Sequence, residues 1–350
     1  MHENANRTAP IRLAIAGAGL IGRRHADIIG QCEGVSVASI TDPAPEAQAF
    51  AAEQNLPWYP SLSDMLAADP PDGVIIATPN QMHVENGLEC ITAGLPILVE
   101  KPIAADTVSG AALVDTAEAA GVPVLVGHHR RHNPLIAEAK RRLEAGAVGQ
   151  VVAAHGMFWL YKPADYFNAA WRTQPGAGPI LINLIHDIDL LRHLVGEIAS
   201  VLAVTANRTR GFAVEDTAAI ILRFKNGALG TFTVSDTIVA PWSWELTAAE
   251  NPAYDQTGQT CYTIGGTEGS LELPNGRIWQ HDGPRSWWSP IRAEACTVAP
   301  QDPLVRQIHH FAQVIRGEAT PLVSGEEGLR TLQVVEAIQR AAASGMAEAV

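Results

Sequence analysis

The first third of the chain alternates short, wholly apolar runs with longer stretches in which apolar residues recur every three or four positions. Apolar runs of this kind are typical of parallel strands buried on both faces, and the periodic stretches are typical of amphipathic helices. The predicted strands are Ile11–Ala16, Val35–Ile40, Gly73–Ala77, Pro96–Val99 and Pro123–Val126. The predicted helices lie near residues 20–31, 44–54, 62–68, 81–93 and 106–119. This alternation predicts an α/β fold with a doubly wound parallel sheet.

After about residue 150 the pattern changes to longer, loosely alternating runs. The strands predicted there are Val151–Leu160, Ala199–Asn207, Asp216–Phe224, Ala228–Ile238, Gln259–Ile264 and Gly269–Glu272. Asn226-Gly227 lies between two of these runs and is a strong hairpin signal, so the two strands should pair antiparallel. We therefore expect an α+β region with a large open, mostly antiparallel sheet.

Helices and loops complete this second region. One apolar helix is predicted over roughly Pro179–Val195, and another should begin at Pro134 with Asn133 as its cap. Helices return at 302–316 and 325–343, whereas residues 240–262 and 280–300, rich in Pro, Trp and Ser, are predicted to be loops.

A glycine-rich sequence joins the first predicted strand to the first predicted helix. It reads Gly17-Ala18-Gly19-Leu20-Ile21-Gly22, and the next strand ends at Asp42, about twenty residues later. Gly17 would permit a tight turn, Gly19 a close approach to a pyrophosphate, and Gly22 close packing of helix on strand. The helix start at Leu20 and Ile21 offers N–H groups to phosphates. A glycine turn without a cofactor is the alternative, and this context disfavours it.

Composition narrows the class of protein. The net charge of −13 argues against a nucleic-acid partner, which would need a basic patch. No apolar stretch reaches the length of a membrane span, and Met1–Pro10 lacks the apolar core of a signal peptide, so we expect a cytoplasmic protein without a membrane partner. The scattered cysteines suggest neither a metal site nor a disulfide framework; they are Cys32, Cys90, Cys261 and Cys296.

A length of 350 residues exceeds one ordinary hydrophobic core and predicts two domains. We expect a flexible tail over 1–10, a dinucleotide-binding domain over 11–128, and a substrate and oligomerisation domain over 129–350. The last helices of the chain could instead pack against the first domain.

Polar residues follow three strands of the first domain, at the edge where doubly wound sheets bind ligands. They are Thr78-Pro79-Asn80 with His83, then Glu100-Lys101-Pro102, and finally His128-His129-Arg130-Arg131-His132. Partial burial and neighbouring cations there would suit Lys101 to proton transfer; the alternative is a surface lysine before a proline. The segment 128–132 has no metal-ligand spacing and either reaches the substrate pocket or fixes the following helix.

The apolar helix near residue 185 carries a polar stripe. Asn183 and His186 are three residues apart and Asp189 continues the row, so all three should share one helix face. Burial of such groups is costly unless each has a partner. His186 could therefore act as a general base near neutral pH; the alternative is a hydrogen-bonded core histidine.

Together, in this order, these motifs resemble the glucose–fructose oxidoreductase / inositol dehydrogenase / MocA (Gfo/Idh/MocA) family, from about Ile11 to Ala343. The resemblance implies a Rossmann domain, a C-terminal open sheet that carries a dimer or tetramer interface, and NAD(P)-dependent hydride transfer at a secondary alcohol or ketone of a sugar, polyol or related ring. It places Glu100 near the nicotinamide ribose, Lys101 at the reacting hydroxyl and His186 as the acid/base. Thr78, Asn80 and His83 would line the cofactor.

One position departs from the family pattern. Many members have an aspartate four residues before the catalytic histidine, whereas this chain has Ile182, with Asn183 beside it. Either Lys101 carries more of the proton transfer or Asn183 orients the substrate. Asp187 is a poor substitute because adjacent helix residues do not face each other. The departure suggests a subgroup with a different substrate.

Cofactor and substrate follow from two further segments. Asp42 would bind a free ribose hydroxyl and repel a 2′-phosphate, and Pro43 and Ala44 supply no arginine for that phosphate, which predicts NAD over NADP. The substrate pocket is expected between the domains, with a small polar cyclic substrate contacted by the segment Phe158–Arg172. Its candidates are Trp159, Tyr161, Lys162, Tyr166, Trp171 and Arg172.

The leading hypothesis is therefore an NAD-dependent dehydrogenase of a sugar, an inositol-type polyol or a cyclic cis-diol. Two alternatives stay open. One is an NAD-binding regulator without activity, which the presence of both Lys101 and His186 disfavours. The other is a reductase of a carbonyl or imine, because cofactor binding does not fix the direction of the reaction.

Overall fold

The computed structural model describes residues 9–296 and 298–350, which form two compact units. The first unit combines the described part of Met1–His132 with Pro303–Leu332, and the second combines Asn133–Asp302 with Gln333–Val350. The boundary between Leu332 and Gln333 falls inside helix α10 (Gly325–Ser344). Of the predicted tail, all but Ala9 and Pro10 lies outside the described residues.

The first unit contains a six-stranded, all-parallel sheet, as predicted, in the order β3-β2-β1-β4-β5-β6. The strands are β1 (Ile11–Ala16), β2 (Val35–Thr41), β3 (Trp58–Tyr59), β4 (Gly73–Ile76), β5 (Ile97–Val99) and β6 (Val124–Val126). Five match the predicted strands within one or two residues. The prediction missed β3, because two residues are too few to show any periodicity.

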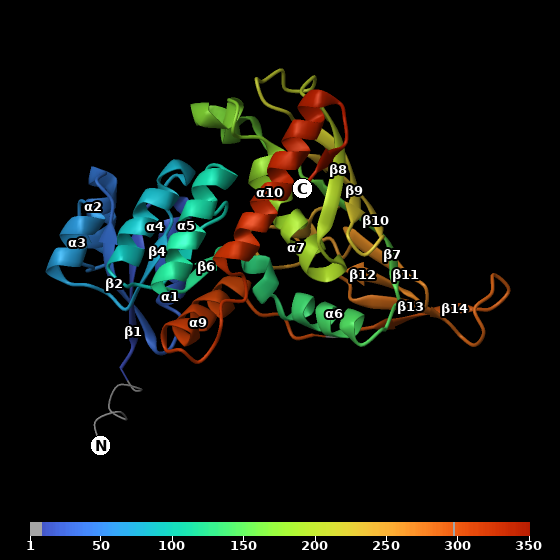
Figure 1. Cartoon of the computed structure of the whole chain (residues 1–350), viewed down its shortest axis with the longest axis horizontal. Coiled ribbons are helices and arrows are strands. Elements are labelled where there is room, and N and C mark those ends of the chain that lie inside the picture. The colour runs from blue at the N-terminus through green and yellow to red at the C-terminus, as the bar shows by residue number, and fades with distance from the viewer. Residues whose placement is uncertain (1–8, 297) are drawn as a thin grey trace. The chain divides into compact units, whose positions relative to one another are not determined.

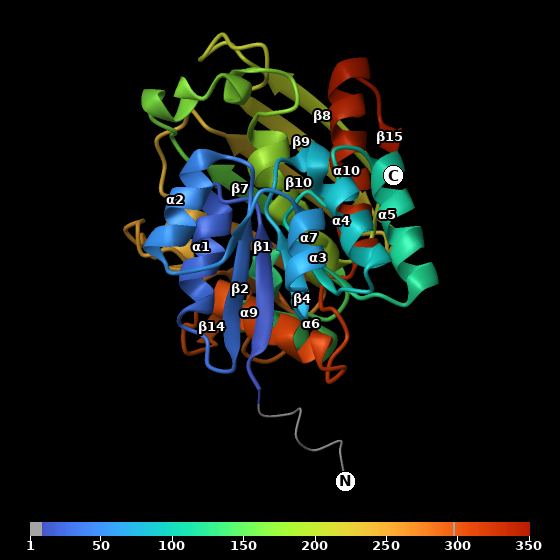
Figure 2. The same cartoon turned by 90° about the vertical axis from the view of Figure 1, so that its left-hand side faces the viewer.

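Helices cover both faces of this sheet. They are α1 (Leu20–Ile29), α2 (Pro45–Glu53), α3 (Leu62–Ala68), α4 (His83–Thr92), α5 (Thr107–Ala120) and α9 (Pro303–Ile315). Figure 2 shows α1 and α2 on one side of the strands and α3, α4 and α5 on the other. Leu13, Ile75 and Leu98 are completely buried between these layers, which explains why the strands are apolar throughout. Phe311 of α9 joins the same core.

The strand order reverses at β1, which lies between β2 and β4. Chain segments leaving the carboxyl ends of β1 and β4 diverge there, and such a switch point is where open α/β sheets bind ligands. The glycine-rich sequence leaves β1 and Thr78 follows β4, so both predicted motifs lie at this position of the sheet.

The second unit contains a nine-stranded sheet in the order β14-β13-β12-β11-β7-β10-β9-β8-β15. Its strands are β7 (Val151–Trp159), β8 (Ile198–Ala206), β9 (Thr217–Phe224), β10 (Leu229–Ser235), β11 (Tyr262–Gly266), β12 (Ser270–Leu273), β13 (Arg277–His281), β14 (Ile291–Ala295) and β15 (Glu348–Ala349). Among the described strands of this sheet, only β7 and β10 pair in parallel. Asn226 and Gly227, whose φ is +90°, form the predicted hairpin between β9 and β10.

Two predicted loops contain regular structure, so those predictions are wrong in part. The short helix α8 (Trp244–Thr247) lies within 240–262, and β14 with the end of β13 lies within 280–300. All five residues of β14 are exposed, so its sequence shows no apolar alternation. Register with β13 alone defines this edge strand.

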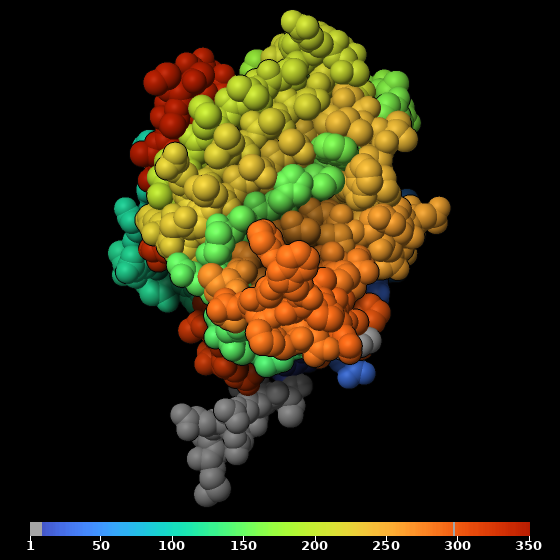
Figure 3. Space-filling model, turned by 90° about the vertical axis from the view of Figure 1, so that its right-hand side faces the viewer, coloured from blue at the N-terminus to red at the C-terminus, as the bar shows by residue number. Residues whose placement is uncertain are grey.

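One face of this sheet is covered by α6 (Pro134–Glu144), α7 (Ile185–Val195) and the second half of α10 (Figure 1). The Asn133 side chain accepts a hydrogen bond from Leu135 N, which confirms it as the cap of α6. Buried Phe158, Phe232 and Ile188 lie on this side. Figure 3 shows the other face, where β7 in green runs between the yellow strands and the orange ones. No helix among the described residues is both long and apolar enough to cross a bilayer.

Candidate functional site

The turn from β1 into α1 packs too closely for any side chain at two of its glycines. Gly17 has φ of +93°, and a Cβ there would lie 2.6 Å from the Ala77 carbonyl oxygen. A Cβ on Gly22 would lie 1.9 Å from the Gly17 carbonyl oxygen. By contrast, a Cβ on Gly19 would meet no described atom within 4 Å. Gly17 and Gly22 therefore build the turn, and Gly19 leaves open space above it.

The start of α1 faces this open space. The first helical backbone bond runs from Arg23 N to Gly19 O at 3.0 Å, so the N–H groups of Leu20, Ile21 and Gly22 precede the regular ladder. Leu20 is 88% exposed and Ile21 is 36% exposed. Uncommitted N–H groups at the positive end of a helix fit a pyrophosphate, so this loop suits a dinucleotide.

Asp42 lies at the end of β2 and also holds the glycine-rich turn in place. One carboxylate oxygen accepts a 2.8 Å hydrogen bond from Ala18 N, and the other accepts a 2.8 Å bond from Ala44 N. Each oxygen keeps a lone pair for another donor, so the side chain remains able to bind ribose hydroxyls. The sequence indicated the acid but not its bond to the turn, because that bond depends on the pairing of β1 with β2.

The segment after β4 combines an accessible rim with a buried support. The Thr78 hydroxyl donates to Asn86 Oδ1 at 2.9 Å, and Asn80 is partly exposed. His83, however, is only 1% exposed, with Nε2 2.9 Å from Thr78 O and Nδ1 2.8 Å from Pro102 O. Burial lowers the pKa of His83, and its two carbonyl partners oppose that shift in part. His83 therefore lies behind the rim, with each ring nitrogen facing a backbone carbonyl oxygen, whereas the sequence had predicted it on the rim.

Glu100 is buried directly after β5 and is closely surrounded. Its Oε1 lies 2.8 Å from His25 Nε2, and its Oε2 lies 3.3 Å from Lys101 N. A Cβ on Gly127 would lie 2.8 Å from Oε2, so only glycine leaves room for this carboxylate. Burial favours the neutral acid, but the His25 bond and the charges of His25, His129 and Lys101 outweigh it and lower the pKa of Glu100. Glu100 is therefore an anion beside Lys101, which is partly exposed and joined to Pro102 by a cis peptide bond.

The segment His128–His132 is mainly structural. His132 and Arg131 are buried; Arg131 pairs with Glu327 at 2.9 Å and the His132 ring packs against His310 at 5.2 Å. Desolvation and the neighbouring His310 lower the pKa of His132 to about 3. These contacts hold the segment against α9 and α10, so both roles that the sequence left open, reaching the substrate pocket and fixing the following helix, stay predictions. His129 differs, since its charge interacts with Glu100 and Lys101.

In the second unit, the predicted helix around His186 is not α-helical throughout. Residues Ile180–Leu184 form a π-helical turn and α7 begins only at Ile185. Asn183 therefore lies in the π-helical turn and His186 in α7, and the shared helix face of the two residues stays a prediction. His186 lies in the first turn of α7 and is 8% exposed.

The polar residues near His186 in the sequence have different surroundings. Lys162 Nζ donates to Asn183 Oδ1 at 2.7 Å. The Tyr262 hydroxyl donates to Asp187 Oδ1, which directs Asp187 into the core. Asp189, three residues beyond His186 within α7, is also buried. The expectation that Asp187 cannot act beside His186 agrees with its bond to Tyr262.

The aromatic candidates differ in what they contact. Trp159 belongs to the sheet, because its Nε1 donates to Thr233 Oγ1 at 2.9 Å and its ring packs against Trp242. Tyr161 and Trp171 are more than half exposed. Tyr166 lies between two cations, with Lys162 Nζ 4.7 Å and the Arg172 guanidinium 4.0 Å from its ring centre.

Sequence patterns missed one further charged pair in this region. Arg210 Nε lies 2.6 Å from Asp236 Oδ1, and the same guanidinium donates to the Lys162 carbonyl oxygen at 2.8 Å. Burial raises the pKa of Asp236, and the Arg210 bond opposes that shift. Arg210 lies in a turn, and Asp236 falls just after β10 although the predicted strand ran to Ile238, so only their tertiary contact reveals the pair.

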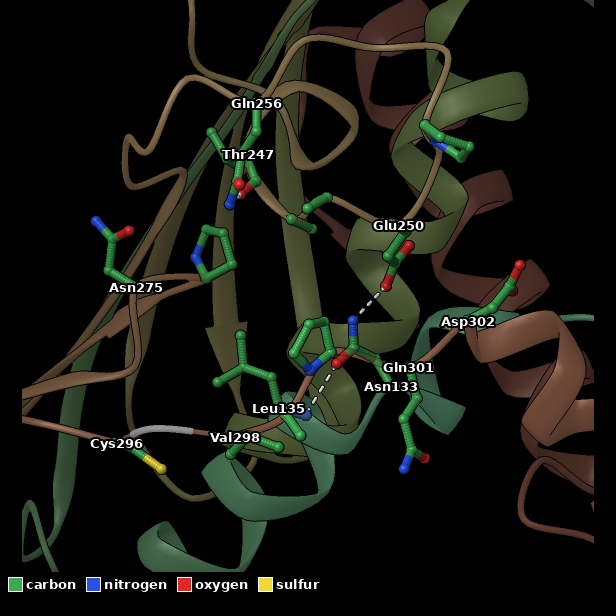
Figure 4. A pocket seen from close by; sticks show the side chains of 16 residues that line it. Asn133, Leu135, Thr247, Glu250, Gln256, Asn275, Cys296, Val298, Gln301 and Asp302 are labelled. Atoms are coloured by element: carbon green, nitrogen blue, oxygen red, sulfur yellow. Dashed lines mark hydrogen bonds between the residues drawn. The ribbon is translucent and has the colours of Figure 1, made fainter.

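A separate cavity of about 490 Å³ lies in the second unit (Figure 4). Asn133, Glu250, Gln256 and Cys296 are among its lining residues, and Asn133 Nδ2 donates to Glu250 Oε1 at 2.7 Å. None of the predicted site residues lines it, and its described lining includes no Lys, Arg or His, so it does not suit a pyrophosphate. No group of three or more His, Cys, Asp or Glu among the described residues could hold a metal ion.

Comparisons with known proteins agree with this geometry. Residues 11–128 match the family model "Oxidoreductase family, NAD-binding Rossmann fold", and residues 136–272 match the model "GFO/IDH/MocA C-terminal domain". The chain belongs to the Gfo/Idh/MocA family of oxidoreductases. These matches confirm the resemblance seen in the motifs. They also confirm that the first unit contains an NAD(P)-binding Rossmann fold.

Relatives carry the names of reductases as well as dehydrogenases. The chain is 28% identical to 1,5-anhydro-D-fructose reductase of Ensifer adhaerens, covering 96% of this chain and 97% of the relative. It is 27% identical to scyllo-inositol 2-dehydrogenase (NAD(+)) of Bacillus subtilis, covering 96% and 95%. The crystal structure of the WlbA dehydrogenase from Bordetella pertussis in complex with NADH and UDP-GlcNAcA is similar with a TM-score of 0.81, 28% identity, and coverage of 97% and 99%.

The glycine geometry predicts that two substitutions will act differently. Gly19→Ala should leave stability unchanged but weaken NADH binding about tenfold or more, because its methyl group enters the space left for the pyrophosphate. Gly22→Ala should weaken binding and also destabilise the fold by about 1–3 kcal/mol, because its methyl group overlaps the Gly17 carbonyl. Fluorescence titration with NADH and urea unfolding measure the two effects. Equal loss of stability in both variants would contradict this division.

Proposed function

We propose that the chain is an NAD-dependent dehydrogenase that oxidises a secondary alcohol of a sugar, an inositol-type polyol or a cyclic cis-diol. Membership of the Gfo/Idh/MocA family supports the reaction type. The observation that carries the proposal is Lys101, which follows β5 beside the buried, ionised Glu100 in the unit that holds the glycine loop. NAD, when bound, supplies the hydride acceptor.

Lys101 and His186 are proposed to take up the hydroxyl proton. The neutral amine of Lys101 accepts a proton from the substrate hydroxyl, and Glu100 stabilises the ammonium that results. His186 is proposed as the second acid/base, at the start of α7. Positioning of the hydroxyl supplies much of the rate, because a correctly oriented group reacts without further loss of entropy.

Asn183 is proposed to orient the substrate in place of the aspartate that position 182 lacks. Lys162 donates to Asn183 Oδ1 and so fixes the amide with its N–H groups available as donors. Tyr161, Tyr166, Trp171 and Arg172 extend this polar and aromatic surface, which suits a small ring bearing hydroxyl groups.

A reductase of a carbonyl substrate is the second candidate. The relative from Ensifer adhaerens carries the name of a reductase, and the same proton-transferring groups serve either direction. Assays of NAD reduction and NADH oxidation, each with a panel of sugars, inositols and cis-diols and the matching ketones, separate the two directions. Binding of NADH without turnover in either direction would favour the regulator instead.

Lys101→Ala should lower kcat by about 10²–10⁴-fold, because it removes a proton acceptor, and should change the NADH dissociation constant by less than about twofold. Lys140→Ala is a matched control, since Lys140 forms a surface pair with Glu144 on α6. Steady-state kinetics and NADH titration measure both effects. Unchanged kcat in Lys101→Ala would remove this residue from the chemistry.

Asp42→Ala should lower kcat/KM with NAD by about tenfold or more and affect NADP less, because the lost carboxylate binds the ribose and repels a 2′-phosphate. Loss of the Asp42 bonds to Ala18 and Ala44 weakens both cofactors equally. The ratio of kcat/KM for the two cofactors therefore isolates ribose recognition. A wild-type enzyme that prefers NADP would overturn the proposal.

A homodimer or homotetramer through the outer sheet face is also proposed. Val204, Ile221 and Leu229 are about half exposed or more on neighbouring strands of the sheet, and apolar surface of this kind is typical of an interface. Ile221→Lys should reduce the mass measured by light scattering, whereas Val108→Lys, at an exposed position of α5, should not. A monomeric wild type would contradict the proposal.

A further inference from the structure

His25 occupies a completely buried position on α1 and contacts the acid next to the proposed proton acceptor. Its Nε2 lies 2.8 Å from Glu100 Oε1, and its side chain has no exposed surface. His25 lies three residues after Gly22, so the helix that begins at the glycine loop also carries the residue that holds Glu100. A single hydrogen bond thus joins the cofactor loop to the strand end that carries Lys101.

Close neighbours restrict the Glu100 carboxylate. Gly127 packs against its Oε2 side and Lys101 N lies 3.3 Å from that oxygen, so the carboxylate has little room to turn away from His25. Removal of His25 would leave this acid buried without its main donor, and a buried acid that loses such a bond shifts toward its neutral form. Lys101 would then lose a neighbouring negative charge.

We propose that His25 is a positioning residue that acts through Glu100 to set the location and the charge of the Lys101 side chain. This inference rests on the proposed role of Lys101 in proton transfer. The other groups whose charges act on Glu100 and Lys101 are His83 from α4 and His129 from the turn after β6, which in turn interacts with His128 and Arg130. Burial and the charge of Arg130 lower the pKa of His129 to about 3.

The direction of the effect follows from these charges. An anionic Glu100 favours the ammonium form of Lys101, whereas a neutral Glu100 does not. His25→Leu should therefore move the titration midpoint of Lys101 to lower pH by about one unit, and the acidic limb of the kcat/KM profile with it. His25→Gln keeps an N–H donor at a similar position and should restore both midpoints to near the wild-type values.

The chain offers a direct readout that needs no turnover. It has four lysines, Lys101, Lys140, Lys162 and Lys225, so the Cε signals of protein labelled with ¹³C-lysine can be followed by NMR across pH. Lys101→Arg assigns the relevant signal. Ile28→Val is the matched control, because Ile28 is buried on the same helix and its substitution loosens packing without removing a donor to Glu100. Glu100→Gln should shift the Lys101 midpoint as His25→Leu does.

A shifted midpoint in His25→Leu and Glu100→Gln, with recovery in His25→Gln and none in Ile28→Val, would establish the positioning role. That result holds even where no polyol is oxidised, so failure of the proposed reaction remains distinguishable. An unchanged Lys101 midpoint in folded His25→Leu, or the same shift in Ile28→Val, would overturn the inference. If His25→Leu does not fold, His25→Phe, which fills the same space without a donor to Glu100, takes its place, and the same two outcomes decide the question.

Discussion

Close packing of backbone against backbone at the turn from β1 into α1 governs what the first unit can bind. Gly17 lies against the Ala77 carbonyl and Gly22 against the Gly17 carbonyl, so strand β4, the turn and the first helix are in mutual contact. Asp42 adds a bond from β2 to the same turn. Three strands therefore position one helix N-terminus, and the open space above Gly19 is a consequence of that packing.

Hydrogen bonds between buried polar groups also fix the strand ends of the first unit. Each of His25, His83 and Glu100 is removed from water but bonded to a group on another segment of the first unit. An unpaired group in such a place costs about 1–3 kcal/mol, so these bonds determine the side-chain orientations more strongly than surface contacts do. Lys101 follows β5 and lies between two residues that have buried partners. Glu100, before it, contacts His25, and the carbonyl of Pro102, after it, faces His83.

Hydrophobic periodicity predicted most of the fold because strands buried on both faces admit few polar residues. It located five of the six strands of the parallel sheet and the hairpin at Asn226-Gly227. It failed at β14, where every residue is exposed, and at Ile180–Leu184, where a π-helical turn contains the same apolar residues as an α-helix. Backbone hydrogen bonding distinguishes those two helices, and apolar composition does not.

By itself, the sequence determined the fold class, the family and the identity of the candidate residues, because a strand, a glycine turn and a helix in fixed order are local features. Only the tertiary structure decided what those residues contact. It showed that His83 faces two carbonyls, that Asp42 also holds the glycine turn, and that Lys162 fixes Asn183. It also brought together His25 and Glu100, which are 75 positions apart. The physical reason is that side-chain hydrogen bonds join segments distant in sequence, and the spacing of residues along the chain does not reveal them.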